Sequence, residues 1–410
     1  MDAKITIRKD PTKPYIGLEH IPSRGAYLTD WALASTSIST NTIFRAGDVL
    51  FGKLRPNLRK CIVAPFDGYC STDILVLRPN EGVDPSFAGK VLRTEQVGIV
   101  AEMTSAGTKM PRTSWKHLSE LEVFCPGLHE QARIAQILDT LDTAIHQTEA
   151  IIAKLEAVKE GLLRDALTRG IDANGELRRP QAEAPHLYKQ SPLGWIPNEW
   201  VASSVSAEFF VDAGITLGAH RAPRNNPKPY LRVANVHRGR LVLDDIATLE
   251  ASQSEVSALG LKRGDLLIVE GHASTDEIGR CAMADDSVVG VLFQNHLFRL
   301  RPFRLRSEFG LLWLNSSFVR AYWRCEAATS SGLNTINRTK LNRLGVAVPT
   351  LAEQEQIIAA DLAISSQLAS ETSMLIKLRR AKSGLMDDLL TGRVRVAPLQ
   401  AEGDQQDGSI

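Results

Sequence analysis

The 410-residue sequence lacks any apolar run of the roughly 18 residues that a membrane-spanning helix needs. Its first residues, MDAKITIRKD, also lack the apolar segment and small-residue cleavage site of a secretory signal. The absences predict a cytoplasmic protein with no membrane partner. A hydrophobic content of 43% is nevertheless ordinary, and the length exceeds that of one compact core, so we expect at least two domains.

Cysteine is scarce and irregularly placed. The five cysteines are odd in number and never form a Cys-x-x-Cys pair, which argues against a disulfide framework and a structural zinc site. We expect five buried thiols: Cys61, Cys70, Cys125, Cys281 and Cys325.

Motifs that carry chemistry are missing as well. The sequence has no G-x-x-x-x-G-K-[ST] phosphate loop, no Asn/Asp-Pro-Pro-aromatic methyltransferase motif and no H-E-x-x-H or deaminase zinc motif. Glu102 and Lys109 fit a nuclease pattern only loosely, because scattered pairs of opposite charge are common. We therefore expect no catalytic residue and no metal ligand in this chain.

The net charge of +1 conceals strongly basic segments. Between Ala213 and Leu243 there are six basic residues and no acidic one, and four arginines fall between His296 and Glu308. Each run could simply be a solvated face. Together they also fit a surface that contacts nucleic-acid phosphates.

The sequence is internally duplicated. A constant shift of 223 places Leu121–Gly170 over Leu344–Arg393, pairing Pro126 with Pro349 and Glu130-Gln131 with Glu353-Gln354. Upstream, GDVLFGK (47–53) answers GDLLIVE (264–270), and PYIGLEHI (14–21) answers PYLRVANV (229–236). A repeat of this length predicts two similar structural units.

Each repeat begins with short β-rich segments, such as Thr42–Phe51, Cys61–Ala64 and Ile74–Arg78, and ends in one long helix with apolar residues at heptad spacing. Each helix should be about 40 residues, or roughly 60 Å, long, and should pack against the other, although folding back onto its own module is an alternative. Thr350 and Glu353 predict a capping box, and Gly170 and Gly392 mark the expected helix ends. The expected packing residues are Ile134, Leu138, Leu141, Ile145, Ile152, Leu155 and Leu162 in the first helix, and Ile357, Ile364, Leu368, Leu375, Leu378, Leu385 and Leu389 in the second, where Asp361, Glu371 and Lys382 interrupt the pattern.

Two features accompany the duplicated order of module and helix: the segment GDVLFGKLRPNLRKCIVAPFDGYCSTDILVLRP (47–79), and the stretch from Trp115 to Ile171 with its copy from Lys340 to Val396. In these features the sequence resembles the specificity subunits of type I restriction-modification enzymes. GWIPNEW (194–200) resembles the opening of the second recognition domain in that family. The resemblance implies a non-catalytic DNA-recognition subunit of a methyltransferase and endonuclease complex. Its partners would be double-stranded DNA, two methyltransferase subunits and restriction subunits, with S-adenosylmethionine, ATP and magnesium bound by those partners and not by this chain.

The expected fold is α+β, with two β-rich target-recognition domains separated by two long antiparallel coiled-coil helices and related by a pseudo-twofold repeat. The expected segments are a first recognition domain (1–127), a first helix (128–170), a linker (171–193), a second recognition domain (194–349), a second helix (350–392) and a C-terminal tail (393–410), which we expect to be disordered after Pro398. The shift of 215 between PYIGLEHI and PYLRVANV predicts that the first domain is about twenty residues shorter than the second.

Basic, amide and histidine side chains in loops near strand ends are the expected DNA contacts, since such groups neutralise phosphates and match base edges. A structural turn is an equal alternative for Arg55-Pro-Asn57, and a satisfied core residue is one for Tyr230 and His272. The candidates are His20, Arg24, Lys53, Arg55, Asn57, Arg59, Lys60, Lys109 and Arg112 in the first domain, and Arg221, Arg224, Tyr230, Arg232, Asn235, His237, Arg238, Arg240, His272 and Asn295 in the second.

Outward positions on the long helices are the expected docking points for the methyltransferase subunits, although a solvated face would account for at least half of them: Gln131, Arg133, Glu149, Lys154, Glu353 and Gln356. A degenerate scaffold that binds those subunits without reading DNA is the main competing function, and a self-contained nuclease is another. The serine- and threonine-rich stretches 104–108 and 329–335 are candidate contact loops, with a plain turn as the alternative.

Overall fold

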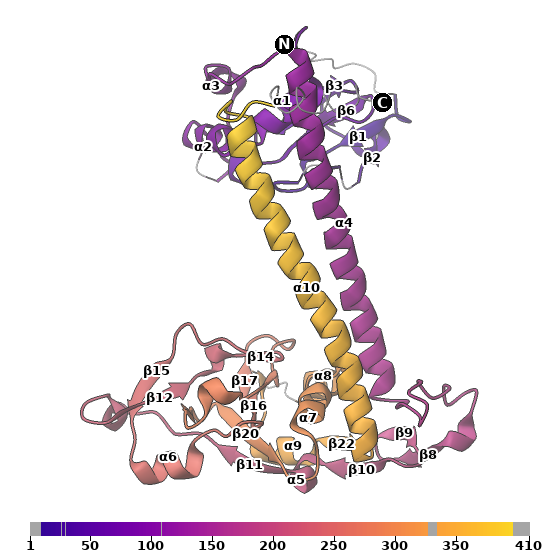
Figure 1. Ribbon diagram of the computed structural model, residues 1–410, viewed down its shortest axis with the longest axis vertical. Helices are drawn as coiled ribbons and strands as arrows, with labels where there is room; N and C mark the ends of the chain where they lie inside the picture. The colour runs from indigo at the N-terminus through magenta and orange to yellow at the C-terminus, as the bar shows by residue number, and fades with distance from the viewer. Residues whose placement is uncertain (1–9, 26, 29, 108, 327–333, 397–410) are drawn as a thin grey trace, which may run out of the picture. The chain divides into compact units, whose positions relative to one another are not determined.

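The computed structural model describes residues 10–25, 27–28, 30–107, 109–326 and 334–396. It contains both helices and sheets, as expected (Figure 1). The chain divides into a first unit, Met1–Ile152 with Ser370–Ile410, and a second unit, Ala153–Ala369. Among the described residues, no helix is both long and apolar enough to cross a membrane.

The first unit is built on two small sheets. One has the strand order β2-β1-β6-β3, in which β1 runs parallel to β6, and the other has the order β5-β4-β7 with antiparallel pairing. The buried core between them includes Ile16, Phe44, Leu50 and Ile62. The strands are β1 (Pro14–Ile16), β2 (Ala32–Leu33), β3 (Asn41–Phe44), β4 (Val49–Gly52), β5 (Cys61–Val63), β6 (Gly68–Ser71) and β7 (Ile74–Leu77), and the short helices are α1 (Pro85–Leu92), α2 (Glu95–Met103) and α3 (Trp115–Leu118).

The segment Thr42–Phe51, expected to be β-rich, forms two strands. A turn separates β3 from β4, because Gly47 has a φ of 85° and the Asp48 carboxylate accepts a hydrogen bond of 2.8 Å from the backbone N–H of Arg45. The Asp48 side chain also pairs with Arg78, which holds the pKa of Asp48 below its ordinary value although burial opposes this shift. The turn folds the chain from one sheet into the other.

The second unit repeats this arrangement and extends it. Strand β12 runs parallel to β19, as β1 does to β6, while β16, β18 and β20 answer β4, β5 and β7. The strands are β8 (Tyr188–Ser191), β9 (Gly194–Pro197), β10 (Val201–Ser204), β11 (Phe209–Ala213), β12 (Pro227–Leu231), β13 (Val236–His237), β14 (Arg240–Leu241), β15 (Ala247–Glu250), β16 (Leu266–Val269), β17 (Gly271–His272), β18 (Cys281–Met283), β19 (Leu292–Phe293), β20 (Leu297–Pro302), β21 (Asn334–Thr335) and β22 (Gly345–Val348). The helices are α5 (Val205–Glu208), α6 (Gln253–Leu259), α7 (Ser307–Leu314), α8 (Ser317–Glu326) and α9 (Arg338–Arg343).

Strands β10 and β11 of the second unit have no equivalent in the described part of the first. Strand β11 extends the sheet by pairing with β20, and β10 pairs with β22. Among the described residues, the corresponding edge of β7 has no paired strand, and residues 121–127, the equivalent of β22, form none. The additional strands lie in the stretch for which the repeat gave no counterpart.

Helices α4 (Leu128–Ala166) and α10 (Leu351–Leu389) each have 39 residues, and each begins in one unit and ends in the other. In the first unit, Ile134 and Leu138 near the beginning of α4 pack with Leu389 near the end of α10, and α1 covers the same cluster (Figure 1). In the second unit, Ala166 at the end of α4 shares a core with Ile357 at the beginning of α10. All fourteen apolar residues predicted for helix packing are buried or half-buried.

The polar residues that interrupt the apolar pattern pair with one another inside each unit. In the second unit, Lys159 Nζ lies 3.1 Å from Asp361 Oδ1 and 2.7 Å from Ser365 Oγ. In the first unit, Lys382 pairs with Asp142, which is 4% exposed and also accepts a hydrogen bond of 2.7 Å from Lys90. Lys159 and Lys382 are separated by the repeat shift of 223, and so are their partners Ser365 and Asp142. The duplication therefore kept a lysine bonded to the same position of the other helix, with serine there in one unit and aspartate in the other.

Both long helices end close to the predicted glycines. Gly170 has a φ of 72°, and a Cβ atom there would lie 2.2 Å from side-chain atoms of both Arg178 and Glu353. Gly392 has a φ of 74° and faces Phe124 in the same way. At the start of α10 only half of the predicted capping box forms: the hydroxyl of Thr350 accepts from the Glu353 N–H, while the Glu353 carboxylate binds elsewhere.

The irregular regions differ in part from the expectations. The stretch 171–193, expected to be a linker, is folded onto the second unit, with Ala184 and Tyr188 buried and β8 paired with β9. The expectation of five buried thiols was wrong for two, because Cys125 and Cys325 are exposed; burial raises the pKa of the Cys61 thiol to about 12. The end of the tail and parts of the serine- and threonine-rich stretches lie outside the described residues.

Candidate nucleic-acid interface

The predicted contact residues of the first unit all lie in loops at one end of its two sheets. Strands β1, β4 and β6 end there, and β5 and β7 begin there, because β1 is parallel to β6 and β4 is antiparallel to β5 and β7. Backbone hydrogen bonds join the loops, from Lys53 to Asp73 and from Arg24 to Arg59. We call residues 17–25, 27–28, 30–31, 53–60, 72–73, 104–107 and 109–114 the first strand-end surface.

The loop 53–60 is held in a defined shape. Arg55 and Arg59 have φ angles of 51° and 50° and flank the 3-10 helix Pro56–Leu58. The half-buried Arg59 guanidinium pairs with Glu95 and, at 3.2 Å, with Glu102 of α2, and these carboxylates raise its pKa while burial opposes the shift. Arg59 therefore supports the loop, and Arg55 and Asn57 are left exposed.

A second loop completes this surface. The backbone N–H of Arg55 donates to Pro111 O at 2.8 Å, and Arg112 bridges in antiparallel fashion to both Leu54 and Ala106. The Arg112 side chain pairs with Asp73 at 2.8 Å, whereas Lys109 is exposed. Arg24, Lys53, Arg55, Asn57 and Lys109 thus face outward or half outward from one set of joined loops.

Two of the predicted contacts in the first unit act as supports. His20 Nδ1 accepts the Gly17 N–H at 2.9 Å, and Lys60 Nζ donates to Leu18 O at 2.6 Å. Both bonds recur in the second unit, where Asn235 Oδ1 accepts the Arg232 N–H and Arg280 donates to Val233 O. The repeat therefore conserves a braced turn at these positions, by means of different side chains.

The loops of the second unit leave the same end of its sheets. Backbone hydrogen bonds join these loops to one another: the Gln294 N–H donates to Leu231 O at 3.0 Å, and the Glu270 N–H donates to His296 O at 3.0 Å. We call residues 214–226, 232–246, 270–280 and 294–296 the second strand-end surface. It contains every predicted contact residue of the second domain except Tyr230.

Glutamates organise the loop 214–226 of this surface. The Glu250 carboxylate accepts hydrogen bonds from the backbone N–H groups of Arg224, Asn225 and Asn226, which lower its pKa. Arg221 pairs with Glu255 at 2.6 Å, and this contact, with bonds from Ser252, lowers the pKa of Glu255 to about 2. Arg221 is thus a support, while the Arg224 side chain is exposed.

The β13–β14 hairpin packs against the loop 270–280. Arg238 donates to Asp276 O at 2.7 Å and to Asn315 Oδ1 at 3.2 Å, and burial lowers its pKa. Arg240 at the hairpin is exposed, His237 is half-buried, and Arg232 pairs with Asp245 at 2.6 Å. Nearby, His272 Nδ1 accepts the Ser274 N–H, His296 lies 2.9 Å from Glu270, and Asn295 is half-buried.

The structure contradicts two predicted DNA contacts of the second domain. Tyr230 is 8% exposed and packs with Ile215, Leu249 and Leu292, so its ring cannot stack on a base. Asn235 is 3% exposed, and its amide donates to Val242 O and Asp245 O. A buried side chain whose hydrogen bonds are all internal has no free group for a base edge.

Two predicted docking residues are also buried, contrary to the prediction that they point outward. Gln131, 1% exposed, donates to Pro126 O and accepts the Asp84 N–H, and its repeat equivalent Gln354 bonds in the same way to Pro349 O and the Arg306 N–H. Glu353, 4% exposed, binds Arg178 and the Trp200 indole. The heptad spacing could not predict the burial of Gln131 and Glu353, because these first-turn residues contact the preceding modules and not the partner helix.

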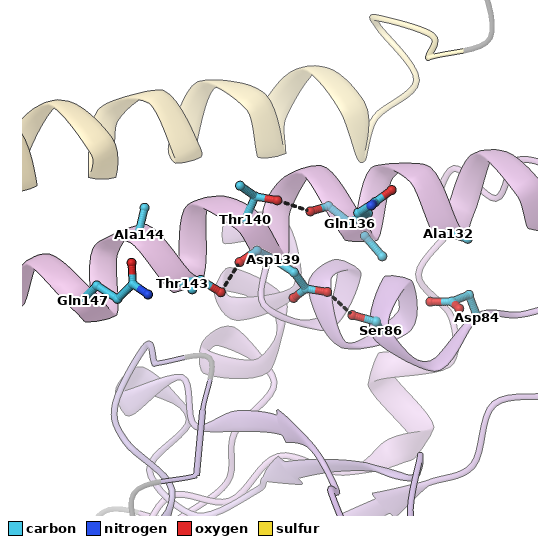
Figure 2. Close-up of a pocket in the computed structure, with 10 residues that line it drawn as sticks. Asp84, Ser86, Ala132, Gln136, Asp139, Thr140, Thr143, Ala144 and Gln147 are labelled. Atoms are coloured by element: carbon cyan, nitrogen blue, oxygen red, sulfur yellow. Dashed lines mark hydrogen bonds between the residues drawn. The ribbon is translucent and has the colours of Figure 1, made fainter. Parts of the chain in front are cut away.

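The other docking candidates are more accessible: Arg133 and Lys154 are exposed, Gln356 is half-buried, and Glu149 pairs with Arg379 at 2.7 Å. Sequence reasoning missed a groove beside them. It runs along α4 past the start of α1, where the Asp139 carboxylate accepts from Ser86 at 3.0 Å (Figure 2). The other residues in the groove are small or polar: Asp84, Ala132, Ala135, Gln136, Thr140, Thr143, Ala144 and Gln147. The α4 residues of the groove recur on the side of the helix opposite its heptad-spaced apolar residues, and this pattern was the sequence signal for the groove.

Known proteins resemble this chain in sequence. Residues 1–157 match the family model described as "Type I restriction modification DNA specificity domain". The chain is 23% identical over 297 residues to the StySPI type I specificity subunit of Salmonella potsdam and 23% identical over 337 residues to the MjaVIII subunit of Methanocaldococcus jannaschii. These alignments cover 72% and 80% of this chain, and 60% and 75% of the two relatives.

Two solved structures share the fold. One, described as "Structural basis underlying complex assembly and conformational transition of the type I R-M system", has a TM-score of 0.57 at 19% identity and covers 96% of this chain and 97% of its own. The type I S subunit from M. genitalium has a TM-score of 0.53 at 14% identity and covers 94% and 90%. The sequence and fold matches confirm the resemblance to type I restriction-modification specificity subunits.

Proposed function

We propose that the chain is the sequence-reading subunit of a type I restriction-modification complex in the cytoplasm, and that its two strand-end surfaces each contact one part of a bipartite DNA target. The observation that carries the proposal is that loops with exposed basic and amide side chains gather at one end of the sheets in both units. Arg55, Asn57 and Lys109 represent the first surface, and Arg224 and Arg240 the second. Such groups provide both phosphate and base-edge contacts.

The two long helices would then act as an antiparallel spacer between the recognition domains. Support comes from the packing inside each unit, where the beginning of one helix meets the end of the other. Each helix of 39 residues is about 58 Å long at the usual rise. The spacer length would set the number of unread base pairs between the two half-sites.

Catalysis would belong to associated subunits. In this proposal, two methyltransferase subunits dock on the long helices, one per repeat, and restriction subunits join them, with S-adenosylmethionine, ATP and magnesium on the partners. The groove at Gln136, Thr140 and Gln147 and the exposed Arg133 and Lys154 are suitable docking points, because small and polar side chains allow a partner helix to approach closely. This chain would supply no catalytic group.

The test is to express the full chain with a modification subunit and map methylated adenine in the host DNA. The proposal expects one bipartite motif that disappears without this chain. An insertion of four residues within Gln147–Leu163, which adds about 6 Å of helix, should lengthen the unread gap by one or two base pairs. Methylation without sequence preference would support the degenerate scaffold instead, and metal-dependent cleavage by this chain alone would support a nuclease.

A further inference from the structure

The two strand-end surfaces differ in charge although the repeat makes them equivalent in fold. The first surface carries seven basic and three acidic residues, whereas the second carries six basic and five acidic ones. Residues 327–337, the sequence counterpart of the loop that contains Lys109, include no charged residue. A polyanion should therefore be attracted more strongly to the first surface than to the second.

Internal ion pairs widen this difference. In the second surface Arg221 pairs with Glu255, Arg232 with Asp245 and Arg280 with Glu277. A cation that already contacts a carboxylate contributes less to binding a phosphate. Arg224, Arg238 and Arg240 form no ion pair with a carboxylate among the described residues. The loop of Arg224 is wrapped around the Glu250 carboxylate, and Arg238 is half-buried and bonded to Asp276 O and Asn315 Oδ1, so Arg240 is the most accessible of the three.

The first surface keeps more of its cations available. Within the part of the chain that the structure describes, Lys53, Arg55 and Lys109 form no ion pair with a carboxylate, and Arg55 and Lys109 are exposed. Only Arg59 and Arg112 are paired with acidic side chains. With the exposed Arg24, which forms no salt bridge among the described residues, four cations thus remain for an external anion on one set of joined loops.

The same loops are also held rigidly before any ligand binds. The non-glycine residues with positive φ in the described chain are Arg24, Arg55 and Arg59, and all belong to this surface. Such conformations are uncommon and persist where surrounding bonds enforce them. Here the bonds are the Arg59 pairs with α2 and the backbone contacts of Arg24 and Arg55. Little ordering entropy would then be lost on binding.

We propose that the two recognition domains divide the work of binding DNA unequally: Lys53, Arg55 and Lys109 of the first strand-end surface supply most of the phosphate-backbone contacts, and the second surface contributes few. This inference rests on the proposed function, because it assigns roles within the same DNA-binding surfaces. It makes the first domain the main source of the salt-dependent, sequence-independent part of the affinity.

The experiment measures DNA affinity against salt for the full chain assembled with its modification subunits, on a duplex carrying the methylated motif. The paired variants are Arg55→Asn/Lys109→Gln in the first surface and Arg224→Gln/Arg240→Gln in the second. Asparagine is chosen at position 55 because it tolerates a positive φ. The control is Arg45→Ala/Lys262→Ala, at equivalent turns at the opposite ends of β4 and β16.

Each phosphate contact contributes roughly 0.9 to the slope of log affinity against log salt concentration. We expect the first variant to reduce the slope by about 2, the second by less than about 1, and the control to leave it unchanged. Equal reductions, or a larger one for the second variant, would overturn the division of labour while leaving DNA recognition intact. A wild-type complex that binds no duplex would instead refute the proposed function.

A scrambled duplex separates this inference from specific base reading. Loss of phosphate contacts lowers the affinity for target and scrambled duplexes by the same factor, whereas loss of a base contact lowers only the former. We expect Arg55→Asn/Lys109→Gln to weaken both equally. Weakening confined to the target duplex would overturn the assignment of these residues to the backbone.

Discussion

Replacement of Glu353 by glutamine should destabilise the second unit strongly. The two carboxylate oxygens accept four hydrogen-bond donors: the Ile171 N–H at 2.8 Å, the Trp200 indole N–H at 2.9 Å and two nitrogens of Arg178. Glu353 is 4% exposed and the Arg178 side chain 11%. Burial tends to lower the pKa of Arg178, but Glu353 outweighs it, so the guanidinium stays charged.

Glutamine has nearly the same size but directs an NH2 group at one pair of donors and leaves the buried guanidinium without a counter-charge. Breaking a buried ion pair in this way costs about 3–5 kcal/mol. The repeat offers a matched control, because Glu130 occupies the equivalent position and binds Arg395 and the Val396 N–H. Arg395 is 53% exposed, so water can solvate its charge, and Glu130→Gln should cost clearly less.

The assay is amide hydrogen exchange in the intact protein, since two units need not unfold together. For Glu353→Gln, exchange should accelerate at Ile171 and in the first turn of α10, with an earlier denaturant transition of Trp200 fluorescence. The exposed Glu355→Gln should change neither. Equal effects of Glu353→Gln and Glu130→Gln would refute the argument that burial of the partner arginine sets the cost.

Three further changes test other parts of the fold. Gln131→Leu and Gln354→Leu should each cost roughly 1–3 kcal/mol, because each strands a buried backbone donor and acceptor, and denaturant unfolding should show similar losses for both. Lys159→Leu should lower the melting temperature, because Asp361 stays half-buried without its cation. The double variant Lys159→Leu/Asp361→Leu should restore or raise the melting temperature. A double variant less stable than the single one would contradict this expectation. The pKa of the Glu255 carboxylate is lowered to about 2 from 4.5, so its contribution to stability is fully present above pH 4.5 and is lost as the pH falls toward 2. Glu255→Gln should therefore flatten the acid side of the stability profile measured by thermal melting. An unchanged profile would show that the Arg221 contact contributes nothing to stability.

The parts of the fold that could be predicted from sequence are those governed by local periodicity. Heptad spacing identified the buried side of both long helices, and Gly170 and Gly392 marked where the helices end. Both signals depend only on residues within a few helical turns. The β segments were less certain. Thr42–Phe51 was predicted only as a β-rich segment, and the limits of β3 and β4 within it depend on how each strand pairs in its own sheet.

The candidate site could be predicted only as a set of loops. Strand order and direction decide which loops share an end of the sheet, and this depends on pairings such as β1 with β6, more than fifty residues apart. Whether an arginine is a support or a contact depends on acidic residues distant in sequence, as with Arg59 and Glu102. For His20 and Asn235 a signal existed, since the repeat aligns them, and a position shared by two recognition domains is better suited to bracing a turn than to reading different bases.

The duplication also has a consequence for how each unit is closed. The first unit contains the beginning of α4 and the end of α10, and Arg395 beyond α10 binds Glu130 at the start of α4. The second unit reverses these roles, with Arg178 beyond α4 bound to Glu353 at the start of α10. Neither half of the sequence contains both members of such a pair, so each recognition domain is completed only when the other half of the chain has folded. A change that weakens the C-terminal end of α4 or α10 should therefore affect the unit on which that end packs, and not the domain that directly precedes the helix in the sequence.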